Sequence, residues 1–118
     1  MADVTSGSKG ERIERGVFGG AGKNLPCTAT PCTIAAAGTW LSSVDRTGVG
    51  NYVLNIAPGT FSAAPTCVCT QGMMGGSPVV CYMGELDATT TSIPMYVFSP
   101  VTQQLYDDTV AVFCMGPR

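Results

Sequence analysis

Residues 51–57 read Asn51-Tyr52-Val53-Leu54-Asn55-Ile56-Ala57 and carry the clearest pattern in the chain. Side chains alternate along this run, with Tyr52, Leu54 and Ile56 on one side and Asn51, Val53 and Asn55 on the other. A period of two is typical of a β-strand that buries one face. The run therefore predicts a strand whose Tyr52 face packs into a core.

Further short segments flank this strand and are separated from it by turn residues. Residues 39–46 precede it through Thr47-Gly48-Val49-Gly50, and Pro58-Gly59 follows it. The remaining strand candidates are residues 66–71, 78–82, 93–100 and 109–115. The 15 glycines and 8 prolines interrupt every stretch that could hold a helical period. This spacing predicts an all-β fold, a small antiparallel β-sandwich or jelly-roll-like knob.

The sequence predicts two regions, a flexible N-terminal arm or linker over residues 1–24 and a β-sandwich domain over residues 25–118. Residues 5–10 are rich in glycine and serine and resemble a flexible lead-in. Residues 12–18 are compatible with a strand that places Ile13, Arg15 and Val17 on one face, and equally with a solvated arm.

The glycine-rich run at residues 19–23 is not a phosphate-binding loop. Its spacing to Lys23 would require a glycine at position 17 and a serine or threonine at position 24, but Val17 and Asn24 stand there.

Composition excludes several classes of function. The chain of 118 residues has no histidine, so it lacks Ser-His-Asp and Cys-His catalytic machinery and zinc sites that need histidine. A formal net charge of −2 gives no support to nucleic-acid binding. No apolar run approaches the roughly 18 residues of a membrane span, so we expect no membrane insertion. Charged residues make up only 12% of the chain, which is typical of assembled or extracellular structural proteins rather than of cytosolic enzymes.

Six cysteines are candidates for disulfide bonds: Cys27, Cys32, Cys67, Cys69, Cys81 and Cys114. Cys27 and Cys32 flank a short loop that permits a local bridge. Cys67 and Cys69 are two residues apart, so on a strand they would share a face and suit two different partners. The alternative is that several are free, buried and simply apolar. No two cysteines are separated by two residues in the C-x₂-C spacing of zinc knuckles, so a thiolate metal cluster is not favoured. We expect no metal or other cofactor.

Residues 38–56 resemble a hairpin of the distal, receptor-binding domains of bacteriophage tail fibres. The hairpin follows the pattern W-x-S-x-V-x-R-x-G-x-G-x-Y-x-[VIL]-x-[FI], and here it begins at Trp40 and ends at Ile56. Gly59-Thr60-Phe61 and a turn of small residues follow, as in those domains, and residues 108–118 are similar to their terminal strand. The resemblance covers most of residues 10–118.

This resemblance implies a non-enzymatic module at the tip of a tail fibre or on the virion surface. Such modules are usually homotrimers of β-sandwich protomers that attach to a host surface glycan or outer-membrane protein through their loops, outside the cell and beside other virion proteins. The chain is too short to hold a fibre shaft, so it is either a tip fragment or a small virion protein. The alternative is a capsid-decoration or filament-forming subunit that assembles through residues 1–24 by strand addition.

Candidate receptor contacts lie in segments with turn residues: Met73, Met74, Gln103, Gln104 and Tyr106. Met73 and Met74 form either an adaptable apolar tip or a plug that folds back into the core. Tyr82, Tyr96 and Tyr106 are compatible with a saccharide-binding face and with ordinary half-buried strand positions. Trp40 is a sugar platform or a core anchor, and its strand setting favours the core.

Two carboxylate pairs, Glu85/Asp87 and Asp107/Asp108, have the spacing to flank a glycosidic bond. Nothing around them in the sequence points to a raised pKa, so we expect no enzymatic activity. A depolymerase fragment is the third possibility.

Overall fold

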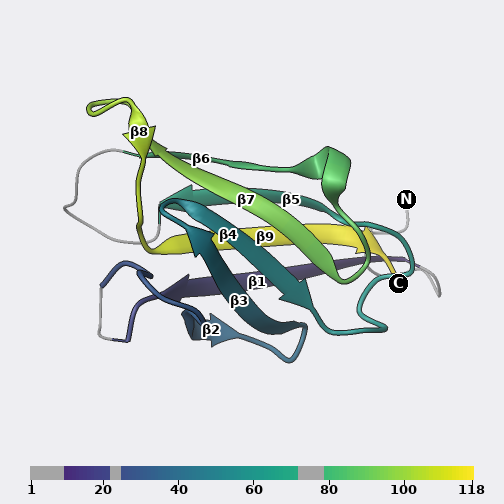
Figure 1. Cartoon of the computed structure of the whole chain (residues 1–118). Helices are drawn as coiled ribbons and strands as arrows, with labels where there is room; N and C mark the ends of the chain where they lie inside the picture. The colour runs from purple at the N-terminus through teal and green to yellow at the C-terminus, as the bar shows by residue number, and fades with distance from the viewer. Residues whose placement is uncertain (1–9, 22–24, 72–78) are drawn as a thin grey trace.

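Two antiparallel β-sheets pack against each other in a computed structural model of the chain, which confirms the predicted all-β sandwich (Figure 1). The structure describes residues 10–21, 25–71 and 79–118. Sheet A has the strand order β2-β1-β9-β5 and contains β1 (Glu11–Gly19), β2 (Thr33–Ala37), β5 (Thr66–Gln71) and β9 (Val110–Pro117). Sheet B has the order β3-β4-β7-β6, with β8 beside β7, and contains β3 (Leu41–Gly48), β4 (Asn51–Ile56), β6 (Val80–Met83), β7 (Ser92–Ser99) and β8 (Gln104–Leu105). A short 3₁₀ turn, η1 (Glu85–Asp87), follows β6.

The core lies between the sheets and is built from alternating positions of the long strands. The side chains of β4 that the sequence assigned to one face are at most 2% exposed. The same alternation places a buried set on each of three strands: Tyr52, Leu54 and Ile56 on β4, Ile93, Met95 and Val97 on β7, and Val110, Val112 and Cys114 on β9. Burial of these apolar side chains is the main source of folding free energy.

The β3–β4 hairpin turns at Gly50, as the glycine-containing turn predicts. Gly50 has a φ of +67°, a conformation that costs L-residues free energy because of their Cβ. A Cβ at this position would also lie 2.5 Å from the Val97 carbonyl oxygen. The turn therefore needs glycine both for its backbone conformation and for its close approach to β7.

The N-terminal boundary differs from the one expected from sequence. Glu11–Gly19, which we assigned to the flexible arm of residues 1–24, forms β1 and pairs with β2 on one side and β9 on the other. Its pairing extends over eight residues of β9, from Glu11 opposite Pro117 to Phe18 opposite Val110. The strand alternative for this stretch therefore holds, and the sandwich begins at β1.

Trp40 lies in the core beneath β1. Its side chain is 1% exposed, and its Nε1 donates a hydrogen bond of 2.9 Å to the Arg15 carbonyl oxygen. Gly16 makes room for the indole, since a Cβ there would lie 3.2 Å from Trp40 Cζ2. The structure thus confirms the core interpretation of Trp40.

All six cysteines are paired in three disulfides. Cys27 and Cys32 form the local bridge that their spacing permits. Cys67 bonds to Cys114 on the neighbouring strand of sheet A, and Cys69 bonds to Cys81 on β6 of sheet B. Cys67 and Cys69 therefore have different partners, and the second of these two bridges joins the sheets covalently.

Candidate functional site

The outer face of sheet B carries an exposed pair of tyrosines. Tyr82 on β6 and Tyr96 on β7 are directly opposite in the register, so both side chains stand on the same face. Their ring centroids are 5.8 Å apart with the ring planes inclined at 34°. Tyr82 is 51% exposed, whereas Tyr96 is half-buried. Two aromatic rings side by side on an open sheet face are an unusual use of exposed apolar area and make this face a candidate binding surface.

Apolar side chains extend this face toward one end of the sheet. Phe98 lies opposite Val80 on one side and Leu105 on the other, so the three form a row beside the tyrosines. Val80 is 48% exposed and Leu105 is 37% exposed. The aromatic pair therefore belongs to a larger apolar surface near the β7–β8 turn.

Polar side chains border the tyrosines on the other side. Asn51 lies opposite Tyr96 in the register and therefore shares its face. Further along the same face the Asn55 amide donates to Ser43 Oγ at 2.9 Å and to Asp45 Oδ2 at 3.0 Å. This arrangement offers amide, hydroxyl and carboxylate groups next to aromatic rings. We call Tyr82, Tyr96 and Asn51 the tyrosine site.

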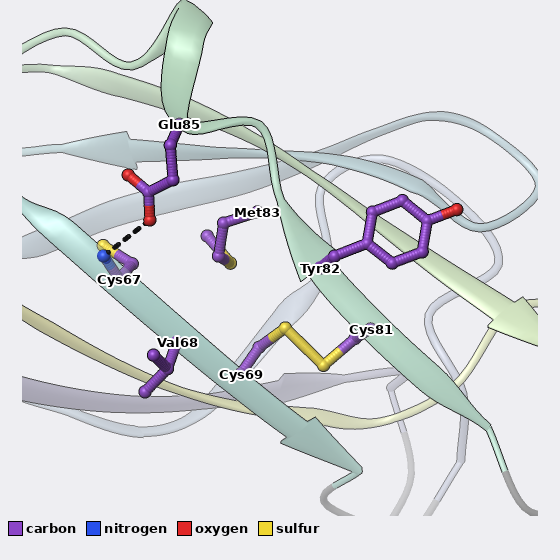
Figure 2. A pocket seen from close by; sticks show the side chains of 7 residues that line it. All are labelled: Cys67, Val68, Cys69, Cys81, Tyr82, Met83 and Glu85. Atoms are coloured by element: carbon purple, nitrogen blue, oxygen red, sulfur yellow. Dashed lines mark hydrogen bonds between the residues drawn. A yellow bond between two sulfur atoms is a disulfide. The ribbon is translucent and has the colours of Figure 1, made fainter.

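A cleft of about 290 Å³ lies beside the tyrosine site, between the edge strands β5 and β6. The Cys69–Cys81 disulfide crosses it at one end, and Glu85 stands at the other end (Figure 2). Met83 lies between the strands, while the Tyr82 ring points away from Met83, as expected for adjacent positions on a strand (Figure 2). Tyr82 nevertheless lines the cleft together with Cys81 and Met83, so the cleft and the tyrosine site share this residue.

Glu85 has a structural contact within this cleft. Its Oε1 accepts a hydrogen bond of 3.0 Å from the Cys67 backbone N–H, as the dashed line in Figure 2 shows. Cys67 lies on an edge strand, and the carboxylate satisfies a donor of that edge. Glu85 lies in η1, the turn that follows β6, and its carboxylate therefore caps the edge of sheet A from the side of sheet B.

The β7–β8 hairpin brings together three of the receptor contacts expected from sequence. Gln103 and Gln104 are exposed, and Tyr106 is 39% exposed. The Gln103 N–H donates to the Ser99 carbonyl oxygen at 2.8 Å, and the Tyr106 N–H to that of Val97 at 3.0 Å. Their backbones are fixed to β7 while their side chains face outward. Met73 and Met74 lie outside the described residues.

At the end of the sandwich, the Asp107 carboxylate accepts hydrogen bonds from four donor groups. Arg46 binds it through Nε at 3.0 Å and through Nη2 at 2.9 Å, and the Gly50 N–H donates to Oδ1 at 2.9 Å. The Tyr52 hydroxyl is also 2.9 Å from Oδ1. Burial alone would raise the pKa of Asp107, but the hydrogen bonds from Arg46, Gly50 and Tyr52 outweigh it and lower that pKa. The same burial, together with the Asp107 hydrogen bond, raises the pKa of Tyr52.

Asp108 is fully buried and engaged elsewhere. Its Oδ1 accepts from the Thr109 N–H at 2.7 Å, and its Oδ2 accepts from Gln71 Nε2 at 2.9 Å. Burial raises the pKa of Asp108 in spite of these two hydrogen bonds. Asp107 and Asp108 therefore serve separate networks, and neither faces an open site with the other.

Among residues 10–21, 25–71 and 79–118, no three cysteine, aspartate or glutamate side chains gather closely enough to hold a metal ion. Within the same described part of the chain, no helix is long and apolar enough to cross a membrane.

The sequence named the tyrosines as candidates but did not join them into a site. Pairing of Tyr82 with Tyr96 depends on the register between β6 and β7, which local alternation does not specify. The cleft was missed altogether, because it arises where the edges of two different sheets meet.

We compared the chain with family models, with curated proteins and with solved structures, and none of the three comparisons gives a match. The tyrosine site and the cleft are therefore interpreted from their own chemistry.

Proposed function

We propose that the chain is a non-enzymatic attachment module of a bacteriophage tail-fibre tip or virion surface, and that it binds a host surface glycan at the tyrosine site. The observation that carries this proposal is the Tyr82–Tyr96 pair, exposed on the outer face of sheet B. The resemblance of residues 38–56 to the tail-fibre hairpin supports the proposed location. The β-sandwich architecture agrees with that class of module.

The chemistry of the tyrosine site fits a sugar ring. One face of a pyranose exposes mainly C–H groups that pack on an aromatic ring, while its hydroxyls need hydrogen-bond partners at the edge. Tyr82 supplies the exposed ring, and Asn51 supplies both an amide donor and a carbonyl acceptor next to Tyr96. On the neighbouring β7–β8 hairpin, Leu105 lies opposite Phe98 and extends this face, whereas Gln104 lies opposite the buried Ser99 and belongs to the other face.

A shallow site of this kind binds each glycan weakly. A homotrimer, which the resemblance implies, would present three such sites at once and raise the effective concentration for the second and third contacts. Attachment then depends on avidity, which suits a repeated polymer on a cell surface.

The non-enzymatic part of the proposal is supported by the state of the carboxylates. Glycosidases need two carboxyl groups that flank the bond, with an open space between them. Asp107 is held by Arg46 and two further donors, Asp108 is buried, and Glu85 accepts from the Cys67 N–H. In each candidate pair, at least one carboxylate is thus engaged in a hydrogen bond within the fold.

The alternative, a decoration or filament subunit that assembles through residues 1–24 by strand addition, draws less support from this structure. Gly16–Phe18 is paired with both β2 and β9, so this half of β1 is not free to extend a neighbour, whereas Glu11–Arg15 is paired with β9 alone among the described strands.

A glycan array tests the proposal. The oxidised full-length protein is applied to an array of bacterial surface polysaccharides, beside the variants Tyr82→Ala, Tyr82→Phe and Tyr96→Ala. We expect the wild type to bind a defined set of glycans and each alanine variant to lose about fivefold in affinity, since an aromatic contact contributes on the order of 1 kcal/mol. Tyr82→Phe should retain most of the binding because it keeps the ring.

The matched control is Leu25→Ala, which removes an exposed apolar side chain that lies before β2 and outside sheet B. This variant should bind as the wild type does. Binding that survives both alanine substitutions would refute the tyrosine site, and binding to purified outer-membrane protein but to no glycan would refute the ligand class.

A further inference from the structure

The outer face of sheet A is apolar although it is open to solvent. Four of its large side chains are well exposed: Val68 at 62%, Ile13 at 50%, Met115 at 45% and Phe113 at 42%. They come from β5, β1 and β9, three adjacent strands of the sheet. We call these four residues the sheet A patch.

Strand register makes the patch continuous. Ile13 lies opposite Met115, and Val68 lies opposite Phe113, while Phe113 and Met115 are neighbours on the same face of β9. Directly opposed side chains in antiparallel strands are close enough to touch. The two pairs therefore form adjoining rows across the centre of the sheet.

Along the strands of an antiparallel sheet with one solvated face, apolar side chains normally point to the core and polar side chains point to the solvent. Here the outward positions of β9 between Val110 and Pro117 are Ala111, Phe113 and Met115, none of which is polar. Each patch residue leaves on the order of 100 Å² accessible, so the patch exposes roughly 400 Å² of apolar surface, a size that marks a contact surface.

We propose that the sheet A patch is the surface through which copies of this chain associate with one another. The first argument is charge. The charged side chains among the outward positions of β1, β5 and β9 are Glu11, opposite Pro117, and Arg15, opposite Phe113, and their charges are of opposite sign. Such a face has little to offer a strongly charged partner, whereas two copies of a nearly uncharged face meet without repulsion.

The second argument is size. The four strands have 9, 5, 6 and 8 residues, so at about 3.4 Å per residue and about 4.8 Å between strands the outer face of sheet A measures roughly 450 Å². Two such faces would together bury roughly 900 Å², which corresponds to a weak association rather than to a stable interface of roughly 1,600 Å². Sheet faces also pack well on one another at about 10 Å, since their side chains interdigitate.

This inference rests on the proposed function only for the number of copies: face-to-face packing of two identical patches gives a dimer, whereas the homotrimer that the resemblance implies needs the patches of three copies to meet around a threefold axis. Association through sheet A would leave the tyrosine site on sheet B exposed, because the two outer faces lie on opposite sides of the sandwich (Figure 1).

Sedimentation velocity on the oxidised full-length protein tests the inference. At about 100 µM we expect a mass two or three times the 12.2 kDa of one chain. Val68→Lys and Phe113→Lys should each shift the protein to a single-chain mass and raise the dissociation constant at least 100-fold, with an unchanged circular-dichroism spectrum. Both positions point to solvent in one chain, so neither charge disturbs the core. Ile13→Ser is a milder variant that should weaken association in a graded way.

The control is Val80→Lys, a similarly exposed valine on the outer face of sheet B, which should leave the mass unchanged. A wild type that stays a single chain at this concentration would overturn the inference, whatever other protein it binds. So would an assembly that keeps its mass in all three sheet A variants. Glycan binding is scored separately: an assembly that the Val68→Lys change dissociates supports the inference even where the array shows no bound glycan.

Discussion

Asp107 fastens the β3–β4 hairpin to the segment that enters β9. It accepts from Arg46 on β3, from the N–H of the turn residue Gly50 and from the hydroxyl of Tyr52 on β4. The Tyr52 hydroxyl is also 2.9 Å from the Cys27 carbonyl oxygen, which links the network to the Cys27–Cys32 loop. A single carboxylate thus joins the β3–β4 hairpin to a segment that lies more than fifty residues later in the sequence.

The Asp107 network makes stability depend on acid. Because the folded-state pKa of Asp107 is lowered, its contribution is complete above the unfolded-state pKa, near 3.9, and is lost as the pH falls through the lower folded value. Asp107→Asn should cost about 2 kcal/mol at pH 7, since hydrogen bonds to a charged group are lost. The same variant should lose less further stability than the wild type as the pH falls below about 4.

Urea unfolding at several pH values measures this effect. Asp87→Asn, which neutralises an exposed aspartate in η1, is the control and should follow the wild type closely. Parallel pH profiles for the wild type and Asp107→Asn would contradict the assigned role.

At the scale of elements, β5 and β6 form the junction at which a disulfide links the two sheets. Each is an edge strand of its own sheet, and edge strands expose unpaired backbone groups. Here the Cys69–Cys81 bridge and the Glu85–Cys67 hydrogen bond tie the two edges together at opposite ends of the cleft (Figure 2). The cleft therefore owes its shape to contacts between sheets rather than within one.

Removing the Cys69–Cys81 bridge should loosen this junction without unfolding the sandwich. The double variant Cys69→Ser with Cys81→Ser should lose about 3 kcal/mol, because the bridge closes a short loop with a sequence separation of 12. Amide exchange should accelerate in β5 and β6 and stay slow in β4. Thermal unfolding monitored by circular dichroism, together with exchange mass spectrometry, measures both effects.

The matched control is the double variant Cys67→Ser with Cys114→Ser, whose bridge lies within sheet A and has a sequence separation of 47. It should cost more stability, about 4 kcal/mol, yet leave β6 protected. Equal loosening of β6 in both variants would contradict the proposed junction.

Elements with clear alternation could be predicted from sequence, and those defined by their partners could not. The pattern of β4 gave its inward face correctly, because Tyr52, Leu54 and Ile56 are all buried. β2 was missed because Thr33–Ala37 reads TIAAA and has no alternation, so it is a strand only by pairing with β1. Residues 12–18 stayed ambiguous for a similar reason, since Ile13 faces solvent despite being apolar.

The candidate site was predictable only in part. The sequence singled out Tyr82 and Tyr96 as tyrosines on strand segments, but their contact requires the β6–β7 register. The carboxylates show that closeness in sequence can mislead. Asp107 and Asp108 are adjacent in sequence, yet they bind different partners. Adjacent residues on an extended chain point in opposite directions, so sequence proximity does not make a pair of catalytic groups.

At the scale of the whole molecule, the sandwich has two outer faces of different chemistry. Sheet A presents Ile13, Val68, Phe113 and Met115, whereas sheet B presents a tyrosine pair with amide and carboxylate neighbours. A protein that only needed to be soluble would make both faces polar. We therefore propose that sheet A serves association and that sheet B serves ligand binding.

Hydrogen–deuterium exchange tests this assignment most directly. The oxidised full-length protein is measured alone and with the glycan that binds most tightly on the array. The account predicts slower exchange in β6 and β7, which carry Tyr82 and Tyr96, and no change in β1 and β9. Protection confined to sheet A, or no protection at saturating glycan, would contradict it.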